Sequence, residues 1–427
     1  MSSQRTGDWS TARLIAFRFV CCYLIAYNIP QQGSASIFDI LPWGNGPLNE
    51  WFSKPLQPVA VWLGRHLFHI TGEGATFHPT GSGDTAMNYV LVFICLCLAV
   101  LGTLIWSLLD RKRKQYRIAS AWLRLFVSFV VAESLVEYGF AKVFPDQFGR
   151  LYIMRLNETY GESSPMALLW TFMAGSRWYT MFGGFAEIIP GILLFFRRTR
   201  TLGALLGTAV LFNVVMLNFC YDVPVKLYSS HLVLMCLFLL APDVMALLRL
   251  FVLRGQAQLK TDHVPASERR WLRLTGYVAL GLIVVCTLLS VGVGAYSPYP
   301  DPEPMQAPLY GHWHVDHADA TTALTAWSDI YIDGRGGPMI VRQVDGKRIR
   351  VNITLNGLQH SVATISPKYG NNTLHYSADA EEMPHHVTID GPFNQGQIHL
   401  ELSRRSPDQY SLLTQGFHWI HEDPPNW

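Results

Sequence analysis

The chain has 427 residues, of which 50% are hydrophobic and only 15% are charged, and its formal net charge is +2. Soluble globular proteins carry about 25% charged residues. This composition excludes a disordered protein, a disulfide-rich secreted scaffold and an ordinary soluble enzyme. The small net charge argues neither for nor against nucleic acid. We expect no nucleic-acid partner, and the lipid bilayer is the first partner that we do expect.

Seven stretches of the chain are apolar over the roughly 20 residues that a transmembrane helix needs. The predicted spans are 12–29, 87–109, 121–141, 178–196, 201–219, 228–248 and 272–293. Lys and Arg gather in the connections after the second, fourth and sixth spans and are sparse in the others. The positive-inside rule then predicts a multi-pass protein of the bacterial inner (plasma) membrane with a cytoplasmic N-terminus. If one weak segment were a buried core helix, the orientation after it would reverse.

The first predicted span and the connection after it are the least regular parts of the N-terminal region. Arg13 and Arg18 lie in the first turns of the span. In the long connection 30–86, the amphipathic segment Pro58–Ile70 predicts a helix on the outer membrane surface, on which His66 and His69 share a face. The turn 81–85 is expected to cap the second span through Asp84 or Thr85, and a substrate-gating loop is the alternative.

Polar groups recur in four consecutive spans, where their burial in lipid is costly and points to function. Glu133 and Glu137 are four residues apart and therefore share one helix face. Glu187 lies beside Pro190 near the middle of the next span. The rest of this predicted set is Tyr138, Lys142, Asn213, Asn218, Tyr221, Asp222, Lys226 and His231.

These groups favour an outward-facing polar pocket in the membrane. Two nearby carboxylates share a proton, which suits a general base, and a desolvated lysine suits an anionic or carbonyl group. We predict catalytic roles for Glu133, Glu137, Glu187, Lys142, Lys226 and His231. We predict substrate binding by Tyr138, Asn213, Asn218, Tyr221, Asp222 and Asp84. The alternative is that the same residues hold the helices together.

The C-terminal part has a different pattern, which begins with a Pro-rich linker at 294–309. In 310–427, apolar and polar residues alternate in short runs between Gly, Asp, Asn and Pro clusters. This pattern predicts an antiparallel all-β domain, a small barrel or sandwich, in the periplasm. The expected strands include 328–333, 339–344, 348–354, 360–365, 373–377, 386–389, 397–403 and 410–414.

Neither the cysteines nor the histidines indicate a redox or metal centre. The seven cysteines lie in or beside the spans and none lies in the β domain, so we expect no outward-facing disulfide exchanger. On a strand, His312 and His314 would share one face with Asp316, while His317 would face the other way. Other histidines, at 385, 386, 418 and 421, would complete a metal site only through folding. We expect no metal.

Short motifs in the middle of the chain carry a family resemblance. Leu123-Arg124-Leu125 followed by Tyr138-Gly139-Phe140-Ala141-Lys142 resembles the first helix of DoxX-like membrane proteins. The segment 182–198, with Glu187 and Pro190-Gly191, is similar to a later part of that family. The ending Thr414–Trp427 resembles the ending of larger DoxX-related bacterial proteins. The resemblance covers roughly 121–248. It implies a four-helix core and a link to quinone-dependent sulfur oxidation or thiol redox chemistry.

The expected fold is a membrane all-α helical bundle followed by an antiparallel all-β domain. Its expected parts are a two-span region (1–120), the DoxX-like core (121–248), a cytoplasmic loop with the seventh span (249–293), the linker (294–309) and the β domain (310–427). The leading functional hypothesis is a redox-linked membrane enzyme or subunit that binds a quinone or a similar lipophilic molecule. The alternatives are a non-redox, carboxylase-like membrane enzyme and an assembly protein that binds a periplasmic partner through the β domain.

Overall fold

The computed structural model describes residues 8–28, 54–77, 83–144, 147–256, 258, 281, 284–285, 288–289, 309–320, 327–334, 336–356, 360–366, 370–380, 383–393 and 396–414. The chain divides into two compact units. The helical unit comprises Met1–Gln147 and Arg177–Tyr296, and the barrel unit comprises Phe148–Ser176 and Ser297–Trp427. Most of the predicted seventh span, most of the Pro-rich linker, Cys286, His418, His421 and the tail after residue 414 lie outside the described residues.

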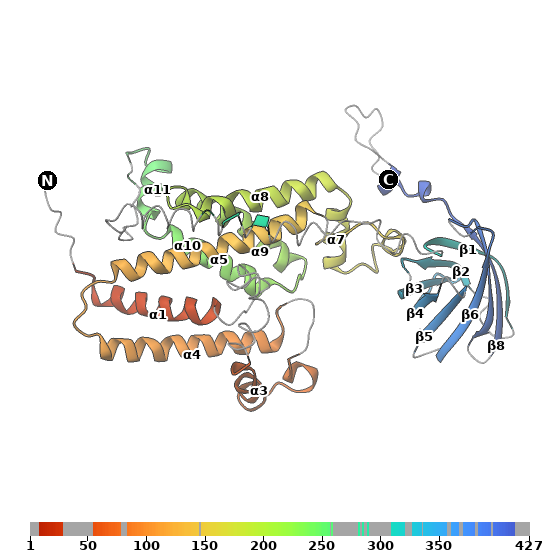
Figure 1. Ribbon diagram of the computed structural model, residues 1–427, viewed down its shortest axis with the longest axis horizontal. Coiled ribbons are helices and arrows are strands. Elements are labelled where there is room, and N and C mark those ends of the chain that lie inside the picture. Colours follow the sequence, from red (N-terminus) through yellow and green to blue (C-terminus); the bar gives the residue numbers. More distant parts are fainter. Residues whose placement is uncertain are drawn as a thin grey trace. The chain divides into compact units, whose positions relative to one another are not determined.

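The helical unit is a multi-pass membrane bundle of long helices (Figure 1). Four described helices, α4, α5, α8 and α9, are long and apolar enough to cross a membrane, and the bent pair α10–α11 makes a fifth candidate. The predicted positions of spans one to six agree with these helices. Their bounds are α1 Thr11–Asn28, α4 Ala86–Leu109, α5 Arg117–Val143, α8 Arg177–Phe195, α9 Arg200–Cys220, α10 Lys226–Leu240 and α11 Val244–Phe251.

Arg18 is compatible with the apolar helix α1 because its charge is satisfied inside the protein. Its guanidinium donates hydrogen bonds to the Ser107 hydroxyl at 2.9 Å, to the Asp110 carbonyl at 2.9 Å and to the Tyr116 hydroxyl at 2.9 and 3.1 Å. The Tyr116 hydroxyl in turn donates to the Asp110 carboxylate. These contacts tie α1 to the end of α4 and the start of α5.

The sixth predicted span is bent rather than continuous. Helix α10 ends at Leu240 and α11 starts at Val244, with an angle of 81° between them. Pro242 lies in the break, where its ring and its missing N–H group oppose helix continuation. Asp243 is buried beside the break and accepts a hydrogen bond from the Thr201 hydroxyl at 2.8 Å.

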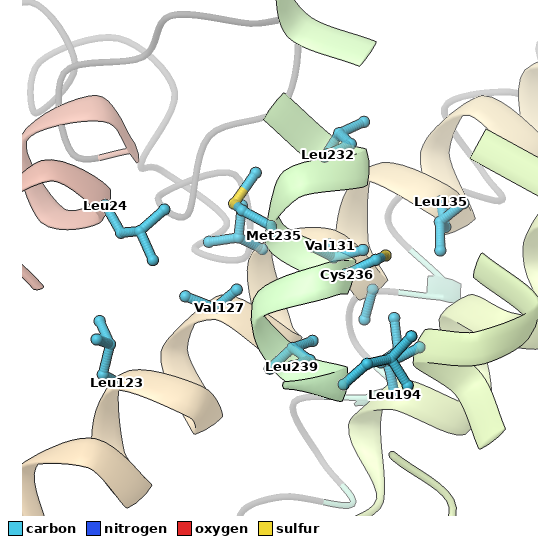
Figure 2. Packing of buried hydrophobic residues seen from close by; sticks show 14 of the residues in the cluster. Leu24, Leu123, Val127, Val131, Leu135, Leu194, Leu232, Met235, Cys236 and Leu239 are labelled. Carbon is cyan, nitrogen blue, oxygen red and sulfur yellow. The ribbon is translucent and has the colours of Figure 1, made fainter. Parts of the chain in front are cut away.

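Helix α5 packs at the centre of the bundle and buries most of its C-terminal half. Val127, Val131 and Leu135 pack with Leu24 of α1 and Leu194 of α8 in one apolar cluster (Figure 2). The cluster also receives Leu232, Met235, Cys236 and Leu239 from α10. By contrast, much of α4 is exposed and apolar, including Leu101, Leu104 and Leu108. In a bilayer such a surface contacts lipid tails.

Glycines allow α5 and α8 to approach closely. A Cβ atom on Gly184 would lie 2.6 Å from the Gly139 carbonyl oxygen and 2.8 Å from Val143 Cγ2. A Cβ atom on Gly139 would lie 2.8 Å from the Gly184 carbonyl oxygen. Small residues of this kind let the backbones of membrane helices come into contact, where packing replaces the absent hydrophobic driving force.

The predicted surface helix is present but shorter than expected. Helix α3 spans Leu56–His66 and is followed by a turn in which His69 has a left-handed backbone, with φ of 52°. The expectation that His66 and His69 share a helix face was therefore wrong. The His66 ring instead bonds to the Trp62 carbonyl oxygen at 2.9 Å.

The C-terminal domain is a closed barrel of eight antiparallel strands in sequence order, in which β8 pairs with β1 (Figure 1). Trp313, Ile330, Val341 and Leu400 are among the apolar residues that fill it. The strands are β1 Gly311–Ala320, β2 Trp327–Ile332, β3 Gly336–Gln343, β4 Arg348–Asn356, β5 Ser361–Ser366, β6 Gly370–Ala378, β7 His386–Phe393 and β8 Gly396–Arg404.

The strand predicted at 410–414 was wrong. A 3-10 turn, Pro407–Gln409, and the short helix α13, Ser411–Thr414, occupy this region. The Ser406 hydroxyl accepts a hydrogen bond from the Asp408 N–H group, and Pro407 follows at the first helical position. Ser followed by Pro is a start signal for a helical turn, and it outweighs the apolar alternation after it.

The segment between α5 and α8 belongs to the barrel unit. It contains α6, Ile153–Leu156, and α7, Pro165–Ala174. The Met154 N–H group donates to the Asp333 carboxylate at 3.2 Å, and Arg348 pairs with Glu162 at 2.9 Å. Residues 148–176 are therefore bound to the barrel, although the sequence pattern placed them within the helical core.

We predict that Gly184→Ala destabilises the helical unit. The new methyl group would overlap the Gly139 carbonyl oxygen, and such overpacking costs about 1–3 kcal/mol of unfolding free energy. Gly161→Ala is the matched control, because a Cβ atom there meets nothing within 4 Å. Thermal unfolding of the two detergent-solubilised variants tests this. An unchanged melting temperature for Gly184→Ala would contradict the close contact.

Candidate functional site

Two predicted site residues, Lys142 and Glu187, form a buried ion pair. Lys142 Nζ of α5 donates to Glu187 Oε2 of α8 at 2.7 Å, and the two side chains are only 9% and 4% exposed. The same ammonium group donates to the Tyr138 carbonyl oxygen at 3.2 Å and lies over the Tyr138 ring. The close approach at Gly139 and Gly184 is what brings these two charges together.

His231 lies on the side of the bundle formed by α1 and α10. Its Nδ1 atom is 2.7 Å from the Leu227 carbonyl oxygen, which can only accept, so Nδ1 carries the proton. Its Nε2 atom is then the acceptor for the Tyr23 hydroxyl at 2.6 Å. The Tyr27 ring stacks on the imidazole with centroids 4.0 Å apart. Contacts at both ring nitrogens and at one ring face thus fix the orientation of the imidazole.

Hydroxyl and carboxyl groups of α5 extend this arrangement. Ser134 Oγ and the Tyr228 hydroxyl are 2.7 Å apart. Glu133, the residue before Ser134, is buried, and the ring centroids of Tyr138 and Tyr228 lie 6.4 Å apart. We call Tyr23, Tyr27, Glu133, Ser134, Tyr138, Tyr228 and His231 the tyrosine–histidine cluster.

Asp84 caps a different helix from the one expected. Its carboxylate accepts hydrogen bonds from the N–H groups of Lys226 at 2.7 Å and Leu227 at 2.9 Å, at the start of α10. Thr85 caps α4, as predicted, in a capping box with Asn88. Asn218 supports the same corner through a hydrogen bond to Ser229 at 3.0 Å. These contacts position α10, and with it Tyr228 and His231.

The other predicted site residues are less enclosed. Lys226 pairs with Asp222 at 2.7 Å, and the Asp222 side chain is 82% exposed. Tyr221 and Glu137 are half-buried. Asn213 is exposed on α9. The structure therefore brings Lys142 to Glu187 and His231 to Tyr23 and Tyr27, whereas Asn213 is exposed and belongs to neither set.

The sequence interpretation missed Tyr23 and Tyr27. Both were counted as part of the apolar first span, although tyrosines four residues apart share a helix face. The spacing of two hydroxyl-bearing side chains within a span is the signal that would have found them.

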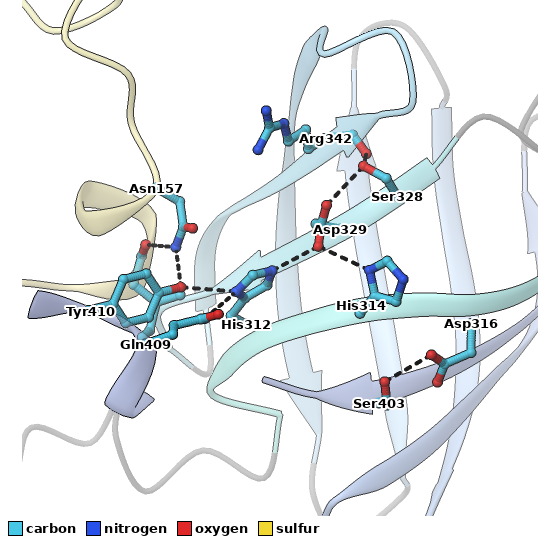
Figure 3. A network of polar contacts seen from close by, with 11 residues as sticks. Asn157, His312, His314, Asp316, Ser328, Asp329, Arg342, Ser403, Gln409 and Tyr410 are labelled. Atoms are coloured by element: carbon cyan, nitrogen blue, oxygen red, sulfur yellow. Dashed lines mark hydrogen bonds and ion pairs between the residues drawn. The ribbon is translucent and has the colours of Figure 1, made fainter. Parts of the chain in front are cut away.

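A second polar network lies on the outside of the barrel (Figure 3). His312 Nε2 lies 2.8 Å and His314 Nδ1 3.3 Å from the same oxygen of Asp329. On its other side, His312 Nδ1 accepts from the Tyr410 hydroxyl at 2.9 Å, and that hydroxyl accepts from the Asn157 amide at 2.7 Å. The network links β1 and β2 to the C-terminal segment and to residues 148–176.

Burial and hydrogen bonding set the charge states in this network. Burial lowers the pKa of His312, against the opposing effect of the Asp329 carboxylate. Burial alone would raise the pKa of Asp329, but hydrogen bonds from His312, Ser328 and His314 outweigh it and the pKa is lowered. A neutral His312 beside an ionised Asp329 agrees with the pattern of donors and acceptors. These hydrogen bonds join β1 and β2 to the C-terminal segment and to Asn157, and they occupy both ring nitrogens of His312.

Asp316 was expected to share a strand face with His312 and His314. A register shift lies between Val315 and His317, and Asp316 accepts a hydrogen bond from Ser403, the strand partner of His314 (Figure 3). Within the described part of the chain, no group of three or more His, Cys, Asp or Glu side chains is placed to hold a metal ion.

Comparison with known proteins identifies one relative. The chain is 37% identical over 123 residues to the uncharacterized protein YwoB of Bacillus subtilis (strain 168), which covers 29% of this chain and 75% of YwoB. No protein-family model matches the chain. No solved structure matches it either.

We predict that Asp333 makes the barrel unit less stable as the pH rises. Burial raises the pKa of Asp333 from 3.8 to about 6, against hydrogen bonds from the N–H groups of Met154 and Ile153. Between these pH values the folded state binds more protons than the unfolded state, so this group lowers the unfolding free energy as pH increases and has no further effect above pH 6.

Asp333→Asn keeps a hydrogen-bond acceptor but cannot ionise. The difference in melting temperature between Asp333→Asn and the wild type should therefore grow between pH 4 and pH 6, in favour of the variant, and then level off. A difference that does not change with pH would show that Asp333 does not titrate in this range.

Proposed function

The chain belongs to the family of the Bacillus subtilis protein YwoB, and from this premise we propose that it is a redox-linked membrane enzyme or enzyme subunit. In this proposal the tyrosine–histidine cluster binds a quinone or a similar lipophilic carbonyl compound. The name of the relative carries no activity, so the proposal rests on the chemistry of the site.

The hydrogen bond between Tyr23 and His231 is the observation that carries the proposal. The Tyr23 hydroxyl and His231 Nε2 are 2.6 Å apart in a part of the bundle lined by aromatic rings. A quinone that takes up two electrons also takes up two protons, one on each carbonyl oxygen. When His231 Nε2 carries a proton it donates to the Tyr23 oxygen, which frees the Tyr23 hydroxyl hydrogen to bond such a carbonyl oxygen. Aromatic side chains suit a flat apolar ring.

Carboxylates of α5 supply the proton-transfer part of the proposal. Glu133 is buried beside Tyr228, and Glu137 lies one helical turn further along. A carboxyl group in an apolar environment is suited to hold and release a proton near neutral pH. The DoxX resemblance implies a thiol or reduced sulfur compound as the electron donor.

The ion pair has a different role in this proposal. Lys142 and Glu187 satisfy each other, so we assign them to positioning α5 against α8 and not to contact with the substrate. Lys226, paired with Asp222, would serve at most as an outer contact for an anionic group. Asp84 and Asn218 hold the start of α10 and so position His231.

The distribution of Lys and Arg supports an orientation for the chain. Basic residues follow α4, at 111–117, and lie between α8 and α9, at 197–200. We propose that these connections and the N-terminus face the cytoplasm of a bacterial cell and that the barrel unit faces the periplasm.

We predict that the protein purified from its membrane with mild detergent carries a quinone. Mass spectrometry of an organic extract measures the quinone per chain. Tyr23→Phe removes the proposed hydrogen bond to a carbonyl oxygen, worth about 1–2 kcal/mol, and should weaken retention about tenfold. His231→Leu should do the same, because it removes the imidazole that holds the Tyr23 oxygen in place.

Lys226→Met is the matched control, because Lys226 lies at the surface and should leave the quinone content unchanged. Equal quinone content in all variants, or a wild-type protein without any, would contradict the proposal. In that case the carboxylase-like and partner-binding hypotheses would gain weight.

A further inference from the structure

Six of the eight exposed residues of α9 form a regular line along the helix, and Phe212 and Phe219 flank it. The residues of the line are separated alternately by four and three residues, which is the spacing of the contact positions in a two-helix coiled coil. We call this line the α9 seam: Leu202, Leu206, Ala209, Asn213, Met216 and Cys220, all of which are exposed.

The opposite face of α9 packs into the described bundle. A Cβ atom on Gly203 would lie 2.9 Å from the Leu194 backbone nitrogen, and one on Gly207 would lie 3.4 Å from Cys236 Sγ. Ala204 and Leu211 are buried on the same side. The α9 seam therefore faces away from α8 and α10.

Asn213 is the polar side chain in the middle of this apolar line. It lies two turns before α9 ends at Cys220, and its amide makes no hydrogen bond to the residues that the structure describes. Lipid tails offer no partner for an amide, and polar side chains within a membrane helix are normally paired. Its exposure therefore indicates a partner surface that carries both a donor and an acceptor at this depth.

We propose that the α9 seam is the contact between two copies of this chain. An asparagine amide complements itself, because its N–H₂ group can donate to the carbonyl oxygen of the same residue across a twofold axis. Two copies inserted in the same orientation place their α9 helices parallel, so that Asn213 meets Asn213. One asparagine at such a position is a known way to fix the register of a helix pair.

Cys220 supplies a built-in probe of this contact. It follows Asn213 by seven residues and so occupies the equivalent position in the repeat, where the two copies of Cys220 would be neighbours. Cys97, which is exposed on α4, is the comparison thiol, because α4 is not part of the proposed contact.

The first test is thiol crosslinking of the full-length protein in native membranes with a short bis-maleimide. We expect a product of twice the monomer mass that disappears in Cys220→Ala and persists in Cys97→Ala. A product that depends on Cys97 instead, or no product, would overturn the proposal. So would crosslinking of Asn213→Cys to a cysteine in 272–293 of the same chain, because the seventh span would then cover the seam.

The second test measures the contribution of the amide. Asn213→Leu should weaken dimerisation in detergent about three- to tenfold, as expected for one hydrogen bond between membrane helices. Asn213→Gln should retain part of the affinity. Leu104→Ala, at an exposed apolar position of α4, is the control for a general change in lipid contact. An Asn213→Leu variant that dimerises as strongly as the wild type would contradict the proposal, whatever its quinone content.

Discussion

The absence of hydrogen-bonding partners in the hydrocarbon is the constraint on which this structure depends. Helix α5 carries two glutamates, a lysine, a serine and a tyrosine in its C-terminal half, and lipid can satisfy none of them. The protein pairs several of them with other helices. Lys142 meets Glu187 of α8, and Ser134 meets Tyr228 of α10. The glycine contact between α5 and α8 lies close to this ion pair along both helices.

This constraint produces two different polar environments around one helix. On the side of α8, opposite charges neutralise each other in a closely packed contact, which suits a structural role. On the side of α1 and α10, the groups are neutral or singly ionisable: phenols, an imidazole and a carboxyl. In the proposed function, that second environment exchanges protons with a carbonyl compound without separating charge. The proposed function therefore belongs to the tyrosine–histidine cluster, and the ion pair holds the scaffold in place.

Sequence patterns predicted much of the fold, because bilayer thickness and strand alternation are local properties. Six helices and all the barrel strands except β1 were placed from such patterns. Strand alternation gave a wrong prediction at 410–414, where Ser406 and Pro407 start a helical turn.

The site was harder to predict, since it depends on how each helix is rotated and which helix it packs against. Lys142 and Glu187 are 45 residues apart, and Asp84 caps a helix 142 residues away. Tyr23 was counted as part of an apolar span, because its hydrogen bond to His231, 208 residues away, depends on how the helices pack.

A double-mutant cycle on Lys142 and Glu187 tests the central claim most directly. It compares the unfolding free energies of Lys142→Met, Glu187→Leu and the double variant, each in the same detergent. If the two charges exist to satisfy each other, each single variant leaves a buried charge unpaired and loses about 3–5 kcal/mol. The double variant should then lose much less than the sum of the two single losses. Additive losses, with no coupling between the two positions, would contradict the account.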